Sequence, residues 1–162
     1  MKPIETDICI IGGGSGGLSL AAGAVQMGAR VVLFEGGQMG GDCLNSGCVP
    51  SKALLAAAKA AYLANGNAAM GITNTPPNID FAAVKAHIAG VIAQIEPHDS
   101  IARFEALGVT VIPEMAHFTG PRAVESAAHQ VRAKYFVIAS GSQPMLPSIP
   151  GLDHTDFFSN AT

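Results

Sequence analysis

The chain has 162 residues, 49% of them hydrophobic, which predicts one domain with a core of its own. Its net charge is −3 without a basic run, so a nucleic-acid partner is not expected, and no apolar run approaches the roughly 20 residues that span a bilayer. Only 13% of the residues are charged, so we infer that a cofactor, more chain or a partner covers part of the surface. Three cysteines without an export signal predict a reducing, cytoplasmic location, where a disulfide is more often catalytic than structural.

The N-terminal residues predict a β-α-β unit. Thr6–Ile11 is a short apolar run, typical of a strand buried on both faces, in which Cys9 is a small core residue. The glycine-rich residues 12–17 lead into a small-residue helical stretch, Leu18–Met27. Arg30–Glu35 then predicts a second strand with an acid at its end.

Within this unit, Gly12, Gly14 and Gly17 form the pattern G-x-G-x-x-G. The first glycine allows a tight turn, the second lets the backbone approach a pyrophosphate, and the third lets helix and strand pack closely. The helix N-terminus supplies N–H groups and a positive dipole to phosphates. Glu35 follows Gly17 by 18 residues, where an acid accepts hydrogen bonds from a ribose diol. The pattern therefore indicates a nucleotide-binding turn and not a merely structural glycine-rich turn. The acid at Glu35 favours FAD or NAD over NADP as the nucleotide.

Residues 40–52 place two cysteines five positions apart, directly before a helix. In a regular helix the α-carbons of residues i and i+5 lie about 8.6 Å apart, whereas a disulfide requires roughly 7 Å or less. If Cys43 and Cys48 pair, the span between them is therefore not regular helix, and Gly47 offers the backbone freedom for this distortion. Lys52–Ala64 reads as helix from its Ala and Leu content, so Cys48 would lie at a helix N-terminus, where the dipole favours thiolate. This pattern indicates a reactive dithiol, with two buried, inert cysteines as the alternative.

The remaining elements predict a parallel sheet with an inserted antiparallel meander. They are a loop at Asn65–Asp80, a helix at Phe81–Ile95 capped by Asp80, a second helix from Asp99 or Ser100 to Leu107, a strand at Val109–Ile112, three short β runs at Met115–Thr119, Arg122–Glu125 and His129–Ala133, and a strand at Lys134–Ala139. The tail from Gln143 on, rich in proline, reads as linker. The five histidines have no metal-ligand spacing, so no metal site is expected.

Four motifs in order resemble the N-terminal part of the pyridine nucleotide–disulfide oxidoreductases, in the dihydrolipoamide dehydrogenase and mercuric reductase branch. They are the glycine fingerprint ending in Glu35, the block Gly41–Lys52, the run Ile138–Ser142, and Ile149–Gly151. The resemblance covers essentially all 162 residues. It implies a Rossmann-like α/β FAD-binding fold: a parallel sheet with helices on both faces and a small antiparallel β-meander. It also implies that residues 1–143 are the N-terminal segment of the FAD-binding domain and that residues 144–162 are a linker toward a missing nicotinamide-binding domain.

The resemblance further implies a role for each matching residue. Cys48 would be the thiol next to the flavin, able to form a charge-transfer pair with it, Cys43 the thiol that exchanges with substrate, and Lys52 a cation that tunes the flavin. The residues implied for the rest of FAD are Gly12, Gly14, Ser15, Gly16 and Gly17 at the pyrophosphate, Glu35 at the ribose, Gly41, Asp42 and Gly47 on the flavin side, Ala116 at the adenine, and Ser140 with Gly141 closing over the cofactor. Two residues depart from the family pattern: Asp42 stands where many members carry Thr or Ser, and Ser140 replaces a more usual Thr.

The function implied is the transfer of electrons between NAD(P)H, FAD and the Cys43–Cys48 dithiol, and on to a small-molecule disulfide, a dithiol or Hg(II), in a homodimeric parent enzyme. The sequence holds one glycine fingerprint and no second, nicotinamide-binding unit. We therefore expect a piece of a longer enzyme that is inactive alone. Two alternatives stay open: a non-catalytic module that binds FAD or ADP, and a flavin monooxygenase-like domain with incidental cysteines.

Overall fold

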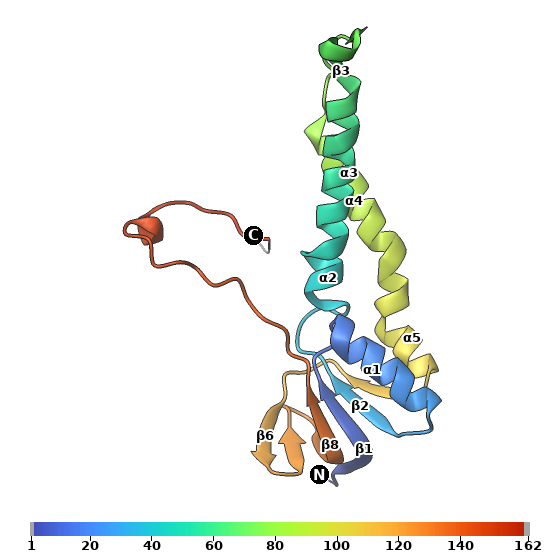
Figure 1. The fold of residues 1–162 in the computed structure, drawn as a ribbon. Coiled ribbons are helices and arrows are strands. Elements are labelled where there is room, and N and C mark those ends of the chain that lie inside the picture. Colours follow the sequence, from blue (N-terminus) through green and yellow to red (C-terminus); the bar gives the residue numbers. More distant parts are fainter. Residues whose placement is uncertain (1, 161–162) are drawn as a thin grey trace.

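The computed structural model describes residues 2–160, and a six-stranded sheet in the order β5-β2-β1-β8-β7-β6 organises them (Figure 1). The first four strands in this order are parallel, and β7 and β6 continue the sheet as antiparallel strands. Their bounds are β1 Ile4–Ile11, β2 Val31–Phe34, β5 Val109–Ile112, β6 His117–Gly120, β7 Ala123–Glu125 and β8 Gln130–Ile138. The predicted α/β Rossmann-like fold with a small antiparallel meander is confirmed, but among the described residues helices pack on one face of the sheet, and the meander covers the other.

Alternating apolar residues of the parallel strands build a core on each face of the sheet. On one face, Ile10 and Leu33 pack with residues of helix α1 (Ser15–Gln26) and with Phe104 of helix α5 (Ile101–Ala106). On the other face, Cys9 and Phe34 pack with buried residues of the meander, among them Val124 and Val131. Because side chains alternate along a strand, a run such as Val31–Phe34 is buried at every position only when both faces are covered.

Strand β8 differs from the sequence prediction, which divided it into His129–Ala133 and Lys134–Ala139. The structure has one continuous strand, Gln130–Ile138. Its first residues pair with β7 on one edge while the strand pairs with β1 along most of the length of the other edge, so it belongs to the meander and to the parallel sheet at once. The exposed Arg132 and Lys134 interrupt the apolar pattern without interrupting the strand.

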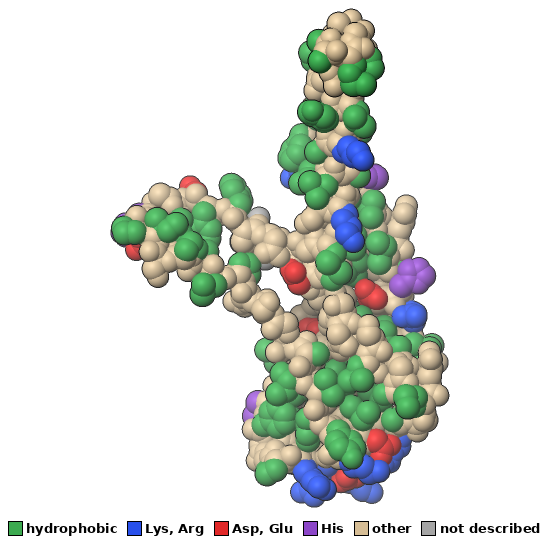
Figure 2. Space-filling view, viewed as in Figure 1, with side chains coloured by type: hydrophobic (Ala, Val, Ile, Leu, Met, Phe, Trp, Pro, Cys, Tyr) green, Lys and Arg blue, Asp and Glu red, His purple; other side chains and the backbone are tan. Residues whose placement is uncertain are grey.

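Two long helices project from the sheet as a hairpin, and Figure 1 shows them running together away from it. They are α3 (Cys48–Ala64) and α4 (Phe81–Ile95), and α4 has no buried residue. The N-caps of α4 and α5 agree with the prediction, since Asp80 Oδ1 accepts from Ala83 N at 3.1 Å and Ser100 Oγ accepts from Arg103 N at 3.3 Å. Apolar side chains cover much of the projecting hairpin surface (Figure 2).

Short elements complete the chain between and after these helices. The hairpin tip, predicted as loop, contains β3 (Gly66–Asn67), the 3₁₀ turn η1 (Ala68–Met70) and β4 (Ile72–Thr73). Helix α2 (Gly41–Asn45) precedes α3, and η2 (Glu96–Asp99) links α4 to α5. The tail after β8 is extended apart from η3 (Leu152–His154), and the domain boundary at residue 143 stays a prediction. Within residues 2–160, no helix combines the length and apolar character required to cross a membrane.

Phe104 supplies the largest side chain between α5 and the sheet, and it is 1% exposed. We expect Phe104→Ala to lower the free energy of unfolding by about 3–5 kcal/mol, because it leaves a cavity in the core. Urea denaturation followed by circular dichroism measures this loss. Leu63→Ala, at a side chain 63% exposed on α3, is the control and should change stability little; equal losses in both variants would contradict the assigned core.

Candidate functional site

The glycine-rich turn after β1 brings three segments into backbone contact. Gly12 has a φ of +113°, and a Cβ at this position would lie 2.2 Å from the carbonyl oxygen of Ala139. A Cβ at Gly17 would lie 1.9 Å from the carbonyl oxygen of Gly12. Only glycine fits at these two positions, so the end of β1, the start of α1 and the end of β8 pack together without side chains between them.

The N-terminus of α1 carries no side-chain cap. Its N-cap residue is Gly14, no side chain accepts a hydrogen bond from the cap, and the first turn holds no acidic residue. An added Cβ at Gly16 would meet nothing within 4 Å, so the first turn borders open space. The N–H groups of a first helical turn lack intrahelical partners and attract anions, so this helix end suits a phosphate group.

Backbone contacts also join the glycine turn to the segment that carries the cysteines. Gly40 N donates to Gly13 O at 2.9 Å, and a Cβ at Gly41 would lie 2.7 Å from Gly14 Cα. Gly40 and Gly41 both have positive φ, at +86° and +56°. Helix α2 starts at this contact, which places Cys43 one short turn from the N-terminus of α1.

Glu35, at the end of β2, orders the same turn with its carboxylate. Oε2 accepts from Gly13 N at 2.5 Å, and Oε1 accepts from Gly37 N at 2.6 Å. Each carboxylate oxygen can accept more than one hydrogen bond, so Glu35 keeps acceptor capacity for ligand hydroxyl groups. The carboxylate thus shapes the turn and borders the open space beside it.

The two cysteines of residues 40–52 lie together at the junction of two helices. Helix α2 ends at Asn45 and α3 begins at Cys48, so the predicted break between Cys43 and Cys48 is present. Asn45 Nδ2 holds α2 in place by donating to Met39 O at 3.1 Å and to Gly41 O at 2.8 Å. Both thiols are free, and Cys48 occupies the first position of α3, as predicted.

The neighbouring Cys48 affects the ionisation of the Cys43 thiol. The hydrogen bond with Cys48 raises the pKa of Cys43, burial and the charge of Cys48 raise it further, and the nearby charge of Lys52 lowers it. Cys9 lies apart from this pair in the core of the sheet, where burial raises its pKa to about 12. Burial therefore excludes Cys9 from thiol chemistry near neutral pH.

These features surround one cleft of about 780 Å³ at the carboxyl ends of the parallel strands. The residues proposed from sequence that line it are Gly12, Gly14, Ser15, Gly16, Glu35, Gly41, Asp42, Cys43, Cys48, Ala116, Ser140 and Gly141. Three others do not line it. Gly17 packs beneath the carbonyl of Gly12, Gly47 packs against Asp42, and Lys52 is exposed one turn into α3.

The cleft also contains polar and flexible residues that the sequence patterns did not single out: Gln38, Asn45, Ser46, Glu114, Met115 and Ser142. Asn45 and Ser46 lie between the two cysteines in sequence, and this position could have indicated that they border the site. Glu114 has no such signal, because it enters the cleft only through the pairing of β5 with β2. Its carboxylate accepts from Ala128 N at 3.1 Å, and a hydrogen bond from Ser126 is the main cause that lowers its pKa.

Comparisons with known proteins agree with this geometry. Residues 6–162 match the family model described as pyridine nucleotide-disulphide oxidoreductase. The chain belongs to this family. Among curated members, it is 33% identical over 158 residues to a mercuric reductase of Bacillus cereus and 34% identical over 164 residues to a dihydrolipoyl dehydrogenase of Bacillus subtilis (strain 168). These alignments cover 98% and 99% of the chain, but only 25% and 34% of the two relatives.

A solved structure supports the fold of this pyridine nucleotide-disulphide oxidoreductase chain. It is the Cu(II) complex of the HOCl-induced flavoprotein disulfide reductase RclA from Escherichia coli. The TM-score is 0.73 at 24% identity, and the match covers 92% of the chain and 31% of RclA. At this level of identity the likeness concerns the fold. The chain therefore corresponds to about a quarter to a third of the length of its relatives.

The effect of Cys48 and Lys52 on the pKa of Cys43 can be measured. We expect Cys48→Ala to lower the pKa of Cys43, because it removes the hydrogen bond and the charge that raise it. In that background, Lys52→Met should raise the pKa of Cys43 again by removing a nearby positive charge. The readout is the pH dependence of iodoacetamide alkylation of the Cys43 peptide, followed by mass spectrometry. Lys59→Met, further along α3, is the matched control, and a shift of equal size in this control would contradict a local effect of Lys52.

Proposed function

We propose that the chain is the FAD-binding and dithiol segment of a flavin-dependent disulfide oxidoreductase. In this proposal, electrons pass between NAD(P)H, FAD and the Cys43–Cys48 dithiol, and the acceptor is a small-molecule disulfide or Hg(II). The observation that carries the proposal is that both cysteines line the same cleft as Gly12, Gly14 and Glu35. This juxtaposition favours a redox role over a flavin monooxygenase-like domain with incidental cysteines.

The residues of the cleft fit the phosphate and ribose portions of FAD. The uncapped N-terminus of α1, with Gly14, Ser15 and Gly16, would hold the pyrophosphate, and Gly17 would support it from beneath by its close packing. Glu35 would accept hydrogen bonds from the ribose hydroxyls with its remaining lone pairs.

The other residues proposed from sequence, in the cleft and beside it, would complete the FAD site. Those proposed beside the flavin are Gly41, Asp42, Gly47 and Lys52, the one proposed at the adenine is Ala116, and those proposed to close over the cofactor are Ser140 and Gly141. When bound, FAD supplies two-electron redox chemistry beside the thiols. The support for this arrangement is the cleft itself, which spans from Glu35 and Ala116 at one set of strand ends to Cys43 and Cys48.

The two thiols account for disulfide reduction as a balanced exchange. The Cys43 thiolate attacks one sulfur of a substrate disulfide, forms a mixed disulfide and releases the first substrate thiolate. The Cys48 thiolate then attacks the Cys43 sulfur, forms the Cys43–Cys48 disulfide and releases the second substrate thiolate. Two electrons leave the dithiol, and the two released thiolates take up the protons. Two adjacent thiolates are also soft ligands of the kind that a soft metal ion such as Hg(II) prefers as substrate.

Two further properties belong to this proposal. A cytoplasmic location suits a dithiol that must return to its reduced form, since the cytosol keeps thiols reduced. A homodimer suits the projecting hairpin, because α3 and α4 expose large apolar side chains, which on soluble proteins often mark interaction surfaces. These side chains are Leu54, Leu55, Tyr62, Leu63 and Phe81.

The spectrum of the FAD-loaded protein tests the assignment of the two thiols. We expect the reduced dithiol protein with oxidised FAD to show a long-wavelength absorbance band from a flavin–thiolate pair. Cys48→Ser should abolish this band, whereas the matched variant Cys43→Ser should retain it, because Cys48 is the thiol proposed beside the flavin. An unchanged spectrum in the Cys48 variant would favour the monooxygenase-like reading.

A non-catalytic module that binds FAD or ADP is a second candidate, favoured by the single glycine fingerprint of the 162 residues. Intact mass and absorbance of the purified protein show which nucleotide is bound. Nucleotide binding without turnover of NAD(P)H and a disulfide supports the module for this chain. Turnover by these residues alone would contradict the expectation that the reaction requires a longer enzyme.

Sedimentation velocity at increasing protein concentration tests the hairpin as a contact between two copies. We expect association that Leu55→Glu combined with Leu63→Glu weakens about tenfold or more, since charges would then enter an apolar contact. Lys59→Gln combined with Lys85→Gln changes charge on the same hairpin without removing apolar surface. Association that is equally strong in the glutamate variant would place any dimer contact elsewhere.

A further inference from the structure

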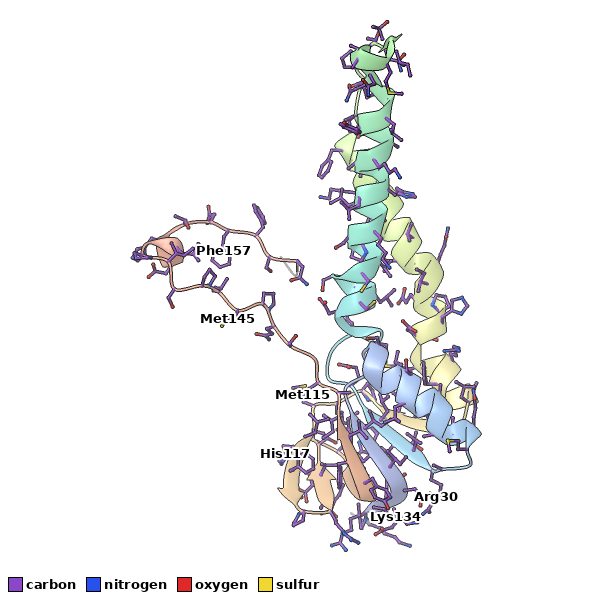
Figure 3. All side chains as sticks on the ribbon, in the orientation of Figure 1. Arg30, Met115, His117, Lys134, Met145 and Phe157 are labelled. Carbon is purple, nitrogen blue, oxygen red and sulfur yellow. The ribbon has the colours of Figure 1, made fainter. Side chains whose placement is uncertain are left out.

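A second cavity lies at the amino-terminal edge of the sheet, at the end opposite to the glycine cleft. Its volume is about 540 Å³, within the range of small-molecule sites. Four of the nine lysines and arginines of the chain line it: Arg30, Arg122, Arg132 and Lys134. Figure 2 shows Lys and Arg side chains gathered at the base of the sheet, and Figure 3 labels Arg30 and Lys134 there.

Strand order brings these four residues together from distant parts of the chain. Arg132 and Lys134 are two residues apart on β8, so they lie on one side of the sheet. Arg122 comes from the turn between β6 and β7, and its carbonyl oxygen accepts from Ala133 N at 3.4 Å. Arg30 immediately precedes β2. The hydroxyl-bearing Thr119 lines the same cavity.

The acidic residues near the cavity neutralise only part of its positive charge. Asp7 pairs with both Arg30, at 3.2 Å, and Lys134, at 2.7 Å. Glu5 is the single acidic residue that lines the cavity. Across residues 2–160, no acidic oxygen lies within 4.0 Å of a guanidinium nitrogen of Arg122 or Arg132. The cavity region therefore holds an excess of two positive charges, although the chain as a whole carries −3.

We propose that this cavity binds a small, multiply charged phosphate-type anion, such as a diphosphate or a phosphate monoester, through Arg122 and Arg132. A guanidinium presents a planar fork of N–H donors that matches the oxygens of a phosphate, and such charge-assisted hydrogen bonds are the strong ones. Asp7 holds the neighbouring cations in place, so the two arginines form the unsatisfied part of the cluster. The excess of two positive charges favours a multiply charged anion.

This site is independent of the proposed FAD site. The glycine cleft lies beyond the carboxyl ends of the parallel strands, whereas this cavity lies beside Glu5, Thr6 and Arg30, where β1 and β2 begin. The two cavities share no lining residue. A ligand can therefore occupy the second cavity whether or not a nucleotide occupies the first.

Isothermal titration calorimetry with inorganic pyrophosphate, at constant ionic strength, tests the proposal on the whole chain. We expect a binding event that Arg122→Gln combined with Arg132→Gln weakens about tenfold or more, since each arginine loses charge-assisted hydrogen bonds, whereas any further event at the N-terminus of α1 should be unchanged. Both side chains are exposed, so the fold should persist, and circular dichroism checks this. The matched control, Lys59→Gln combined with Lys85→Gln on the hairpin, removes the same charge and should leave the affinity unchanged.

Three outcomes would overturn the proposal. A titration of the arginine variant that is unchanged from that of the original chain would place all pyrophosphate binding elsewhere, for example in the glycine cleft. Equal weakening in the lysine control would mean a general charge effect. Binding of malonate as tight as that of pyrophosphate would contradict a phosphate-type ligand. None of these results depends on FAD, so failure here and failure of the proposed function are distinguishable.

Discussion

Backbone contact between Gly14 and Gly41 joins the two halves of the candidate site. A Cβ on Gly41 would lie only 2.7 Å from Gly14 Cα. A side chain at residue 41 would therefore push the two segments apart. Beneath this contact, Gly17 approaches the carbonyl oxygen of Gly12 in the same manner. The N-terminus of α1 and the segment that carries the two thiols are thus joined through main chain alone.

Much of the fold and part of the site could be predicted because the relevant signals are local. The β-α-β unit follows from the period of apolar residues between Thr6 and Glu35, and the helix caps at Asp80 and Ser100 follow from side chains that bond within three residues. The break between Cys43 and Cys48 follows from the span of a disulfide measured against helix geometry. These inferences use distances along the chain.

What could not be predicted depends on strand order. Strand β8 pairs with β1 on one edge and with β7 on the other, and this pairing joins two separately predicted β runs into one strand. No local sequence pattern reveals that a strand pairs on both edges. Glu114 enters the cleft because β5 lies beside β2, and the arginines at residues 122 and 132 meet because β7 lies beside β8. Exposure is equally non-local: Lys52 follows the cysteines in sequence, yet the direction of α3 keeps it out of the cleft.

The contact between Gly14 and Gly41 also fixes the length of the chain between them. Helix α1 and strand β2 must return the backbone to the same point, so one residue inserted or deleted between these glycines would shift Gly41 out of register and carry the dithiol with it. The length of the α3–α4 hairpin tip is not constrained in this way, since residues 65–80 are mostly exposed and make few contacts outside their own turn. Variation in chain length should therefore accumulate at the hairpin tip, and a reporter peptide grafted there would leave the cleft undisturbed.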